Sequence, residues 1–295
     1  MADARDGMIE KIFGLPFWSG EVSIEPIAGG MTNDNFAVSD AAGQYFVRLG
    51  SDIPVHGVLR FNEFAASQAA AACELSPALL HSAPGVLVFQ WINGRSLQAD
   101  DLRNKDMLAR VVPLLKKCHE ELPKHLRGAA LAFWVFHVIR DYIATLRENN
   151  SPYVDEFERF LMITEELERA VGEIHLVFGQ NDLLPANIID DGKRLWLIDW
   201  DYAGFNSPLF DLANLATNAG LDEAAENILL ELYFGRKPDR PLRTKFLAMS
   251  AASALRETLW SMVSEQVSTL NVDFSAYTSE NRQRFEMTFL RYDFY

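Results

Sequence analysis

The sequence predicts an α+β protein in which a small β-rich lobe, residues 1–92, precedes a larger and mainly helical lobe, residues 93–295. Two observations lead to this prediction. Short apolar runs separated by turn signals are concentrated before residue 92, and helical periodicity dominates after it. One further hairpin signal, at residues 187–200, lies inside the helical part. A cleft between two such lobes is a natural place for a ligand.

The first lobe contains signals for several strands and one helix. The predicted strands are residues 22–27, 35–39, 44–49 and 86–91. The second and third of these flank the turn Asp40-Ala-Ala-Gly43, so we expect a hairpin there. Residues 61–73 are rich in alanine and contain no proline or glycine, which favours a helix. The turn Asn93-Gly94 ends the last predicted strand.

The second lobe is predicted to be built from helices. These are residues 106–121, 132–148, 154–171, 210–219, 223–234, 244–269 and 279–295. Pro113 lies inside the first helix and is expected to kink it. Ser151-Pro152 supplies a cap and a first-turn proline for the third. The apolar stretch 128–139 is shorter than a membrane span and contains His137, so we expect a buried helix there.

The composition argues against several classes of partner. Lys and Arg number 27 and Asp and Glu number 41, which gives a formal net charge of −14. A chain this acidic disfavours nucleic acid and anionic membranes as partners. The acidic N-terminal residues do not resemble a signal peptide, and the two cysteines, Cys73 and Cys118, form no disulfide framework. We therefore expect a cytoplasmic protein without membrane insertion, and the sequence leaves open whether it is a homodimer.

The most informative polar residues lie between positions 178 and 211. Asp182 and Asn187 are five residues apart in a loop that contains Pro185, and Asp199 follows Asn187 by twelve residues. A hairpin centred on Asp191-Gly192 would bring these side chains together at its open end. Two carboxylates and one amide oxygen suit Mg²⁺, which also uses phosphate and water oxygens. Alternatively, one carboxylate can take the proton of an attacking hydroxyl.

This segment resembles the catalytic segment of the aminoglycoside phosphotransferase and choline kinase families, which share the protein-kinase-like fold. Asn181-Asp182 in the loop and residues 198–202 (Ile-Asp-Trp-Asp-Tyr) after the hairpin match the choline/ethanolamine branch and its bacterial relatives. The resemblance implies that Asp182 is the catalytic base and that Asn187 and Asp199 are metal ligands. It also places Asp201 among the substrate-binding residues.

One catalytic-loop position departs from the family pattern. The family has a histidine two residues before the base, and this chain has Gln180. That histidine orients the backbone around the metal-binding aspartate, and a glutamine can donate a hydrogen bond with a different reach. Gln180 therefore leaves open a degenerate kinase that binds nucleotide without transferring phosphate. By the same resemblance, Asp211 braces the loop through hydrogen bonds.

The first lobe resembles the nucleotide-binding part of these kinases. Residues 28–35 resemble the Gly-Gly-x-Thr-Asn segment of choline kinases, and Arg48 stands where most kinases have a lysine. Arginine keeps the charge and can bind phosphate oxygens through two nitrogen atoms. Glu63, on the following helix, is the expected partner of Arg48. The nucleotide-binding residues implied are Gly29, Gly30, Thr32, Asn33, Arg48, Glu63, Phe89 and Ile92.

The C-terminal helices carry the expected acceptor site. Trp260 and Tyr277 match two members of the aromatic cage of choline kinases, in which ring faces attract a quaternary ammonium. Glu257 stands where eukaryotic choline kinases have a second tryptophan, and Asn218 stands where they have an acidic residue. Glu257 could hold an ammonium group that carries hydrogen-bonding protons, as in ethanolamine. The alternative is that both aromatic residues are simply part of the helical core.

The resemblance implies an ATP-dependent and Mg²⁺-dependent phosphotransferase that acts on choline or ethanolamine. Its small substrate would be a cation or an amino alcohol. Two alternatives remain open at this point: a kinase of the same fold for thiamine, an aminoglycoside or a sugar, and a pseudokinase that only binds nucleotide. The six histidines have no partner at catalytic spacing, so we expect no catalytic role for them.

Overall fold

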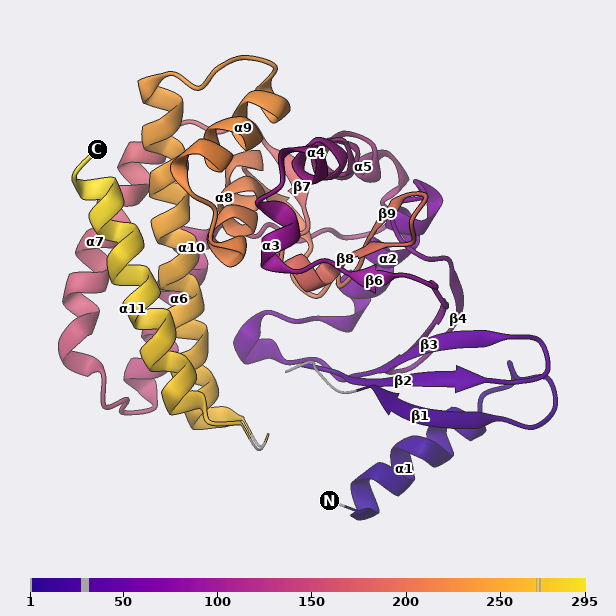
Figure 1. The fold of residues 1–295 in the computed structure, drawn as a ribbon. Coiled ribbons are helices and arrows are strands. Elements are labelled where there is room, and N and C mark those ends of the chain that lie inside the picture. The colour runs from indigo at the N-terminus through magenta and orange to yellow at the C-terminus, as the bar shows by residue number, and fades with distance from the viewer. Residues whose placement is uncertain (1, 28–31, 269, 271) are drawn as a thin grey trace.

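The computed structural model describes residues 2–27, 32–268, 270 and 272–295. It has the predicted α+β architecture, with one antiparallel sheet near the N-terminus and a mainly helical remainder (Figure 1). The expected phosphate-loop residues Gly29 and Gly30 lie outside the described residues. Among the described helices, none combines the length and the apolar composition needed to cross a membrane.

The N-terminal sheet has five strands in the order β1-β2-β3-β5-β4, and all neighbouring strands are antiparallel. These strands are β1 (Ser23–Ile27), β2 (Asp34–Ser39), β3 (Gln44–Leu49), β4 (Leu79–Ala83) and β5 (Val86–Gln90). The predicted hairpin at residues 40–43 is confirmed, because the Asp40 carboxylate accepts hydrogen bonds from the amides of Ala42 and Gly43. Strand β4 was not predicted. It lies at the sheet edge and pairs with β5 alone. Its sequence, Leu-Leu-His-Ser-Ala, does not alternate between apolar and polar residues.

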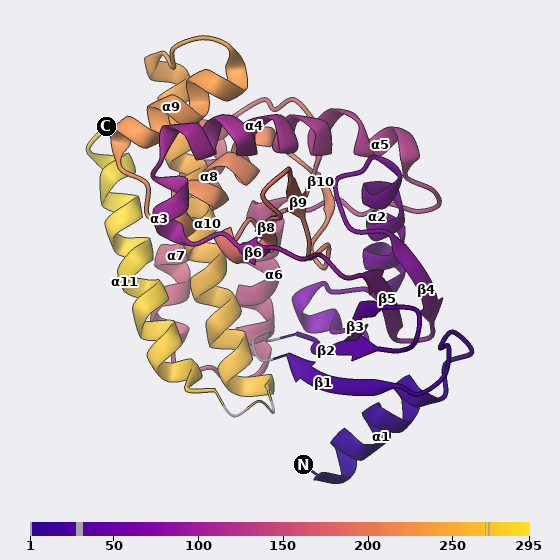
Figure 2. The same cartoon turned by 45° about the vertical axis from the view of Figure 1, so that its right-hand side comes forward.

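Two helices pack against this sheet. Helix α1 (Ala2–Phe13), which was also not predicted, places the fully buried Ile12 against Phe36, Val38 and Val88 of the sheet. The predicted helix α2 (Arg60–Ala72) lies between the sheet and the helical part, where it contacts β4 and the short helix α5 (Leu122–His125) (Figure 2). Burial of Glu63 on α2 directs its carboxylate toward β3.

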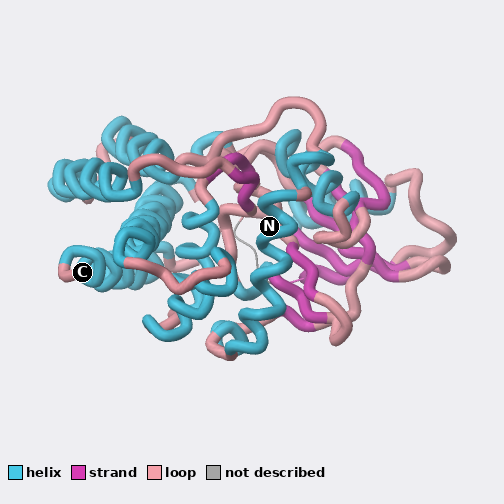
Figure 3. The backbone as a smooth tube through the Cα atoms, turned by 90° about the horizontal axis from the view of Figure 1, so that it is seen from above, coloured by secondary structure: helices cyan, strands magenta, loops and turns pink. Residues whose placement is uncertain are grey.

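The helical part is organised around α10 (Arg240–Val267), most of whose residues are buried. It contacts α6 (Val135–Glu148), α7 (Phe157–Val171), α8 (Pro208–Ala219) and α11 (Phe274–Asp293). The other helices and turns here are α3 (Ala99–Leu102), α4 (Lys105–Glu120), α9 (Glu223–Phe234) and the 3-10 turn η2 (Val154–Glu156). Seen from above, these helices gather on one side of the molecule and the sheet on the other (Figure 3).

The prediction of a helix through residues 128–139 was wrong in its first half. Helix α6 begins at Val135, and residues 126–134 before it are irregular. Phe133 donates its amide to the carbonyl of Phe205, and Phe205 donates to the carbonyl of Leu131. Residues 128–130 and Ala132 are exposed, and Phe133 is the one buried residue in 128–134. The apolar run is therefore a largely exposed connection that touches Phe205 at one bridge, and its composition alone did not distinguish it from a buried helix. The helix predicted at residues 106–121 is confirmed as α4, which continues through Pro113.

Short strands inside the helical part position the polar loops. The hairpin β8 (Ile188–Asp190) and β9 (Leu195–Leu197) confirms the prediction at residues 187–200, and β6 (Arg95–Ser96) joins its edge. Strands β7 (Val177–Gly179) and β10 (Gly204–Asn206) form a separate antiparallel pair. The loops 180–187 and 198–203 therefore each leave one strand pair and enter the other, which brings them side by side.

Candidate active site

Asp211 at the start of α8 fixes the loop that contains Asp182. Its fully buried carboxylate accepts hydrogen bonds from the backbone amides of Gln180 (3.0 Å) and Asn181 (2.8 Å). His119 Nε2 lies 2.9 Å from the same carboxylate, and His119 Nδ1 lies 2.7 Å from Tyr233 Oη. The bracing role implied for Asp211 is thus confirmed. His119, for which we expected no catalytic role, supports this brace from behind.

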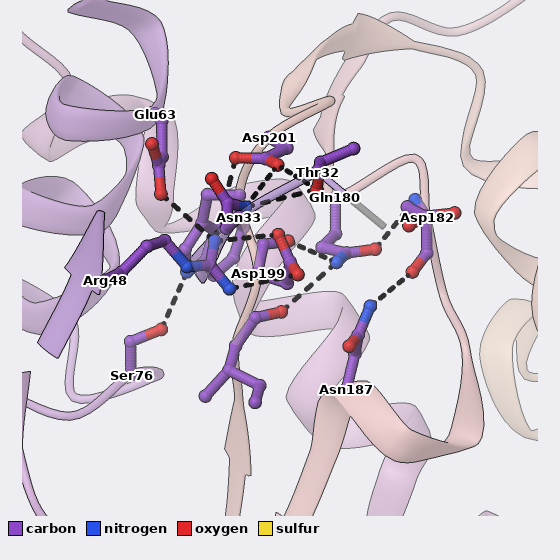
Figure 4. A network of polar contacts seen from close by, with 12 residues as sticks. Thr32, Asn33, Arg48, Glu63, Ser76, Gln180, Asp182, Asn187, Asp199 and Asp201 are labelled. Atoms are coloured by element: carbon purple, nitrogen blue, oxygen red, sulfur yellow. Dashed lines mark hydrogen bonds and ion pairs between the residues drawn. The ribbon is translucent and has the colours of Figure 1, made fainter. Parts of the chain in front are cut away.

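Gln180 connects the two loops of the site (Figure 4). Its Nε2 donates to the carbonyl oxygens of Ile198 (3.2 Å) and Asp199 (2.5 Å), and its Oε1 accepts from the amide of Asp182 (2.7 Å). Asp199 has a positive φ of 65°, which is uncommon for aspartate, so these bonds hold an unfavourable backbone conformation. The glutamine thereby makes the backbone contacts that the family's histidine is expected to make.

Asp182 and Asn187 are joined within their loop. Asn187 Nδ2 donates to the Asp182 carbonyl at 2.9 Å, which leaves Asn187 Oδ1 free to accept another bond or a cation. Burial raises the pKa of Asp182 to about 7 even though Arg256, whose Nη1 lies 3.8 Å from Oδ1, favours its ionised form. A carboxyl group with such a pKa can accept a proton near neutral pH.

Arg48 on β3 forms the centre of a charge cluster. Its Nη1 donates to Glu63 Oε1 (3.0 Å), as predicted. Its Nη1 and Nη2 also bind the two carboxylate oxygens of Asp199 at 3.0 Å each. Arg48 is only 7% exposed, so these charges interact with little screening by water. The cluster brings the expected phosphate-binding cation to the expected metal-binding carboxylate.

Asp201 contacts the first lobe from the other side of this cluster. Its carboxylate accepts from Thr32 Oγ1 (3.0 Å), Asn33 Nδ2 (2.9 Å) and Arg60 Nη1 (2.9 Å). Burial raises the pKa of Asp201 to about 6. We expected Asp201 to bind the acceptor. It lines the cavity of the site, and its hydrogen bonds are made to Thr32 and Asn33, two of the expected nucleotide-binding residues, and to Arg60. Arg60 was missed in the sequence, although its position three residues before Glu63 on a helix was a usable signal.

A cavity of about 580 Å³ joins the predicted sites. Its lining includes Arg48, Phe89, Ile92, Asp182, Asn187, Asp199, Asp201, Glu257, Trp260, Tyr277 and Thr32. Three further predicted residues, Asn33, Glu63 and Gln180, are not in the lining and act on it through the hydrogen bonds above. The cavity is therefore continuous from the Arg48 cluster to the aromatic residues of the C-terminal helices.

The aromatic end of the cavity has a charged component. The rings of Trp260 and Tyr277 are 6.2 Å apart and nearly perpendicular, at 86°. Glu257 accepts from Tyr277 Oη at Oε1 and from Arg256 Nη1 at Oε2, both at 2.7 Å. Arg256 was missed in the sequence, and its guanidinium lies 4.5 Å from the ring centre of Tyr202. Glu257 therefore places a carboxylate, bound to Tyr277 and Arg256, where eukaryotic choline kinases have their second tryptophan.

Tyr202 and His56 contact Trp260 at this end of the cavity, whereas Asn218 lies outside the lining. Trp260 Nε1 donates to Tyr202 Oη at 2.9 Å, and His56 stacks on the Trp260 ring at 4.9 Å. Asn218, where the family has an acidic residue, donates to the Leu183 carbonyl and does not line the cavity. Trp260 belongs to the main hydrophobic core, with Tyr277 packed against that core, and both rings also line the cavity.

The donor set fits a magnesium ion better than a metal held wholly by the protein. Within the described residues, no group of three or more His, Cys, Asp and Glu side chains is arranged to hold a metal. Asp199 and Asn187 line the cavity and offer one carboxylate and one amide oxygen. Mg²⁺ is commonly held by one or two such protein ligands while phosphate and water oxygens complete its shell.

Comparison with known proteins identifies related kinases. Residues 24–250 match the family model described as choline/ethanolamine kinase. Protein LicA of Haemophilus influenzae is 28% identical over 210 residues, which cover 70% of this chain but only 61% of that protein. Ethanolamine kinase 2 of Homo sapiens is 25% identical over 93% of this chain and 78% of that protein. The solved structure of choline kinase LicA from Streptococcus pneumoniae has a TM-score of 0.80 at 22% identity and covers 99% of this chain and 100% of that chain.

Proposed function

Because this chain belongs to the choline/ethanolamine kinase family of small-molecule kinases, we propose that it phosphorylates the hydroxyl of a small amino alcohol such as choline or ethanolamine. ATP is the phosphoryl donor that this family implies. The observation that carries the proposal is one cavity whose lining includes Asp182, Asn187 and Asp199 together with Arg48 and the aromatic pair Trp260 and Tyr277. We also propose residues 1–92 as the nucleotide-binding lobe and residues 93–295 as the catalytic and acceptor-binding lobe.

Asp182 is the proposed catalytic base. It accepts the hydroxyl proton of the acceptor as the acceptor oxygen forms its bond to the γ-phosphorus, and the bond from that phosphorus to the β-phosphate oxygen breaks to leave ADP. The proton then passes from Asp182 to solvent. The pKa of about 7, raised by burial, supports this role because the group exchanges its proton near neutral pH. Gln180 and Asn187 hold the loop in the orientation that this step needs.

The phosphates of ATP are proposed to bind between Arg48 and Asp199. Arg48 would exchange its contact with Asp199 for phosphate oxygens, and Glu63 would keep the guanidinium in place. Asn187 and Asp199 would hold Mg²⁺, which offsets the charge of the phosphates. Phe89 and Ile92 line the part of the cavity next to β5, where we place the adenine. Transfer would then depend mainly on positioning and electrostatics.

The acceptor amine is proposed to bind between Trp260, Tyr277 and Glu257. The ring faces attract a cation, and the carboxylate of Glu257 keeps lone pairs for N–H donors after binding Tyr277 and Arg256. A quaternary ammonium has no N–H group, so it would gain the attraction of the rings and of the Glu257 charge but no hydrogen bond. This arrangement favours ethanolamine over choline as the acceptor.

The proposal is tested by ADP release from Mg·ATP with choline, ethanolamine, thiamine and an aminoglycoside as acceptors. We expect turnover with ethanolamine, slower turnover with choline, and none above background with the other two. The Asp182→Ala variant is the control for ATP hydrolysis that does not depend on the base. ADP release that is restricted to thiamine or the aminoglycoside would replace the proposed acceptor, and ATP binding without any transfer would support a pseudokinase.

A further inference from the structure

The carboxylate of Asp201 joins segments that are far apart in the sequence. Asp201 follows β9 in the helical part, and its partners Thr32, Asn33 and Arg60 belong to the β1–β2 connection and to α2. We call these four residues the Asp201 cluster. Asp201 is 3% exposed, so each of its hydrogen bonds is made where water competes little. Figure 4 shows Thr32 and Asn33 converging on this carboxylate.

The Asp201 cluster is connected to the proposed phosphate site through Glu63. Arg60 Nη1 donates to Glu63 Oε2 as well as to Asp201, while Glu63 Oε1 binds Arg48. Arg48 Nη1 also lies 3.6 Å from Asp201 Oδ1. The position of the expected phosphate-binding guanidinium is therefore set by Glu63, and the position of Glu63 is set in part by Arg60 and Asp201.

Two atoms of the cluster are buried without a hydrogen-bond partner among the described residues. They are Asn33 Oδ1 and Arg60 Nη2. An unpaired buried polar atom lowers stability, and a water or a ligand is a common missing partner. Both side chains approach Gly50, because a Cβ at that position would lie 2.5 Å from Asn33 Oδ1 and 3.0 Å from Arg60 Cζ. The absence of a side chain at Gly50 is what lets the cluster form.

We propose that Asp201 is a nucleotide-positioning residue and makes no contact with the acceptor. It holds Thr32, Asn33 and Arg60 in the arrangement that receives the phosphates of ATP, and through Glu63 it orients Arg48. The inference rests on the proposed function only in placing the nucleotide at this end of the cavity. It assigns the second acidic residue of the segment 198–202 to positioning the nucleotide and not to binding the acceptor.

The test measures ADP affinity by calorimetry without any acceptor. For Asp201→Ala we expect the Kd for ADP to rise at least tenfold, both with Mg²⁺ and with EDTA, while the KM for the acceptor at saturating ATP changes less than twofold. A loss seen only with Mg²⁺ would make Asp201 a metal ligand and overturn the inference. An unchanged Kd with a raised acceptor KM would make it an acceptor-binding residue and would also overturn it.

Two matched variants leave Asp201 in place. Asn33→Ala removes one bond to the carboxylate, and Gly50→Ala crowds Asn33 and Arg60, so each should raise the Kd for ADP at least threefold. The double variant Asp201→Ala/Asn33→Ala should bind ADP no more weakly than Asp201→Ala, since both changes break the same contact. If Asp201→Ala does not fold, unchanged ADP affinity in both matched variants overturns the inference. Failure of the wild-type protein to bind ADP would instead refute the proposed function.

Discussion

Gln180 and Asp199 are joined by a hydrogen bond from Gln180 Nε2 to the Asp199 carbonyl oxygen, and Gln180 Oε1 accepts the amide proton of Asp182. One side chain thus fixes the spacing between the proposed base and the proposed metal ligand. This is the contact that we expected a histidine to make, and it argues that Gln180 preserves the catalytic geometry.

The first prediction concerns this bridge. Gln180→Leu keeps a side chain of similar size but loses all three side-chain hydrogen bonds of Gln180. We therefore expect kcat to fall about 100-fold, because misplacement near 1 Å can cost that much. The acceptor KM should change little. Gln180→His is the matched control and should keep most of the activity. Steady-state ADP release measures both variants, and a Gln180→Leu enzyme with normal kcat would contradict the bridging role.

The second prediction concerns the effect of Asp182 on stability. The pKa of this carboxyl group is 3.8 when free and about 7 in the fold, because of burial. Between pH 3.8 and about pH 7, Asp182 is more protonated in the folded protein than in the unfolded chain. The free energy of unfolding therefore falls as the pH rises through this range, and the full cost of burying the charged carboxylate is reached above pH 7. Asp182→Asn should therefore raise the free energy of unfolding at pH 8 by on the order of 2 kcal/mol, allowing for partial exposure.

Denaturant unfolding of Asp182→Asn and wild-type protein at pH 5 and pH 8 checks this prediction. The stabilisation should be larger at pH 8 than at pH 5. Equal stability of the two proteins at pH 8 would mean that Asp182 carries no burial cost.

The third prediction concerns His56 beneath Trp260. Burial, together with the charge of Arg256, lowers the pKa of His56 to about 4 from 6.5. Between about pH 4 and pH 6.5, His56 is more protonated in the unfolded chain than in the folded protein. The stability that the neutral buried His56 contributes is therefore complete above pH 6.5 and is lost as the pH falls toward 4. Replacement by Gln removes it. The difference in thermal midpoint between wild type and His56→Gln should narrow from pH 7 to pH 5, and a constant difference would refute this.

The fourth prediction concerns Glu257 and the choice of amine. Glu257→Gln removes the charge that strengthens a hydrogen bond from an ammonium group, so the ratio of kcat/KM for ethanolamine to that for choline should fall about tenfold. Tyr277→Phe removes one bond to Glu257 but keeps its charge, and should shift the ratio less. The initial-rate ratio of the two amines measures the effect. No change in preference for Glu257→Gln would remove Glu257 from the acceptor site.

Much of the fold was predictable because local pattern and tertiary structure agree. The hairpin at residues 40–43 has its Asp and Gly turn, and the hairpin β8–β9 has Asp191-Gly192. Helix α1 and strand β4 were missed for a common reason. Neither has a strong local pattern, and each is stabilised by contacts with the sheet, as the burial of Ile12 shows. Such contacts cannot be read from a short window of sequence.

The site was partly predictable for a similar reason. The spacing of Asp182, Asn187 and Asp199 predicted that their side chains lie close together, and all three line the same cavity. The resemblance predicted the pairing of Arg48 with Glu63. Arg60 and Arg256 were missed because charged residues on helices are usually solvated, and only the fold shows that Arg256 is 2% exposed. The hydrogen bonds of Asp201 could not be predicted, because its partners come from residues 32–60, far away in the sequence.

The most direct test of the central claim is detection of the phosphorylated product by ³¹P NMR. Wild-type protein with Mg·ATP and ethanolamine should give a new phosphomonoester signal together with ADP, and Asp182→Asn should give less than about one hundredth of that rate. If Asp182→Asn formed the same product at the wild-type rate, Asp182 would not be the base. If the wild-type protein converted ATP to inorganic phosphate alone, with ethanolamine or choline present, the proposed transfer would be contradicted.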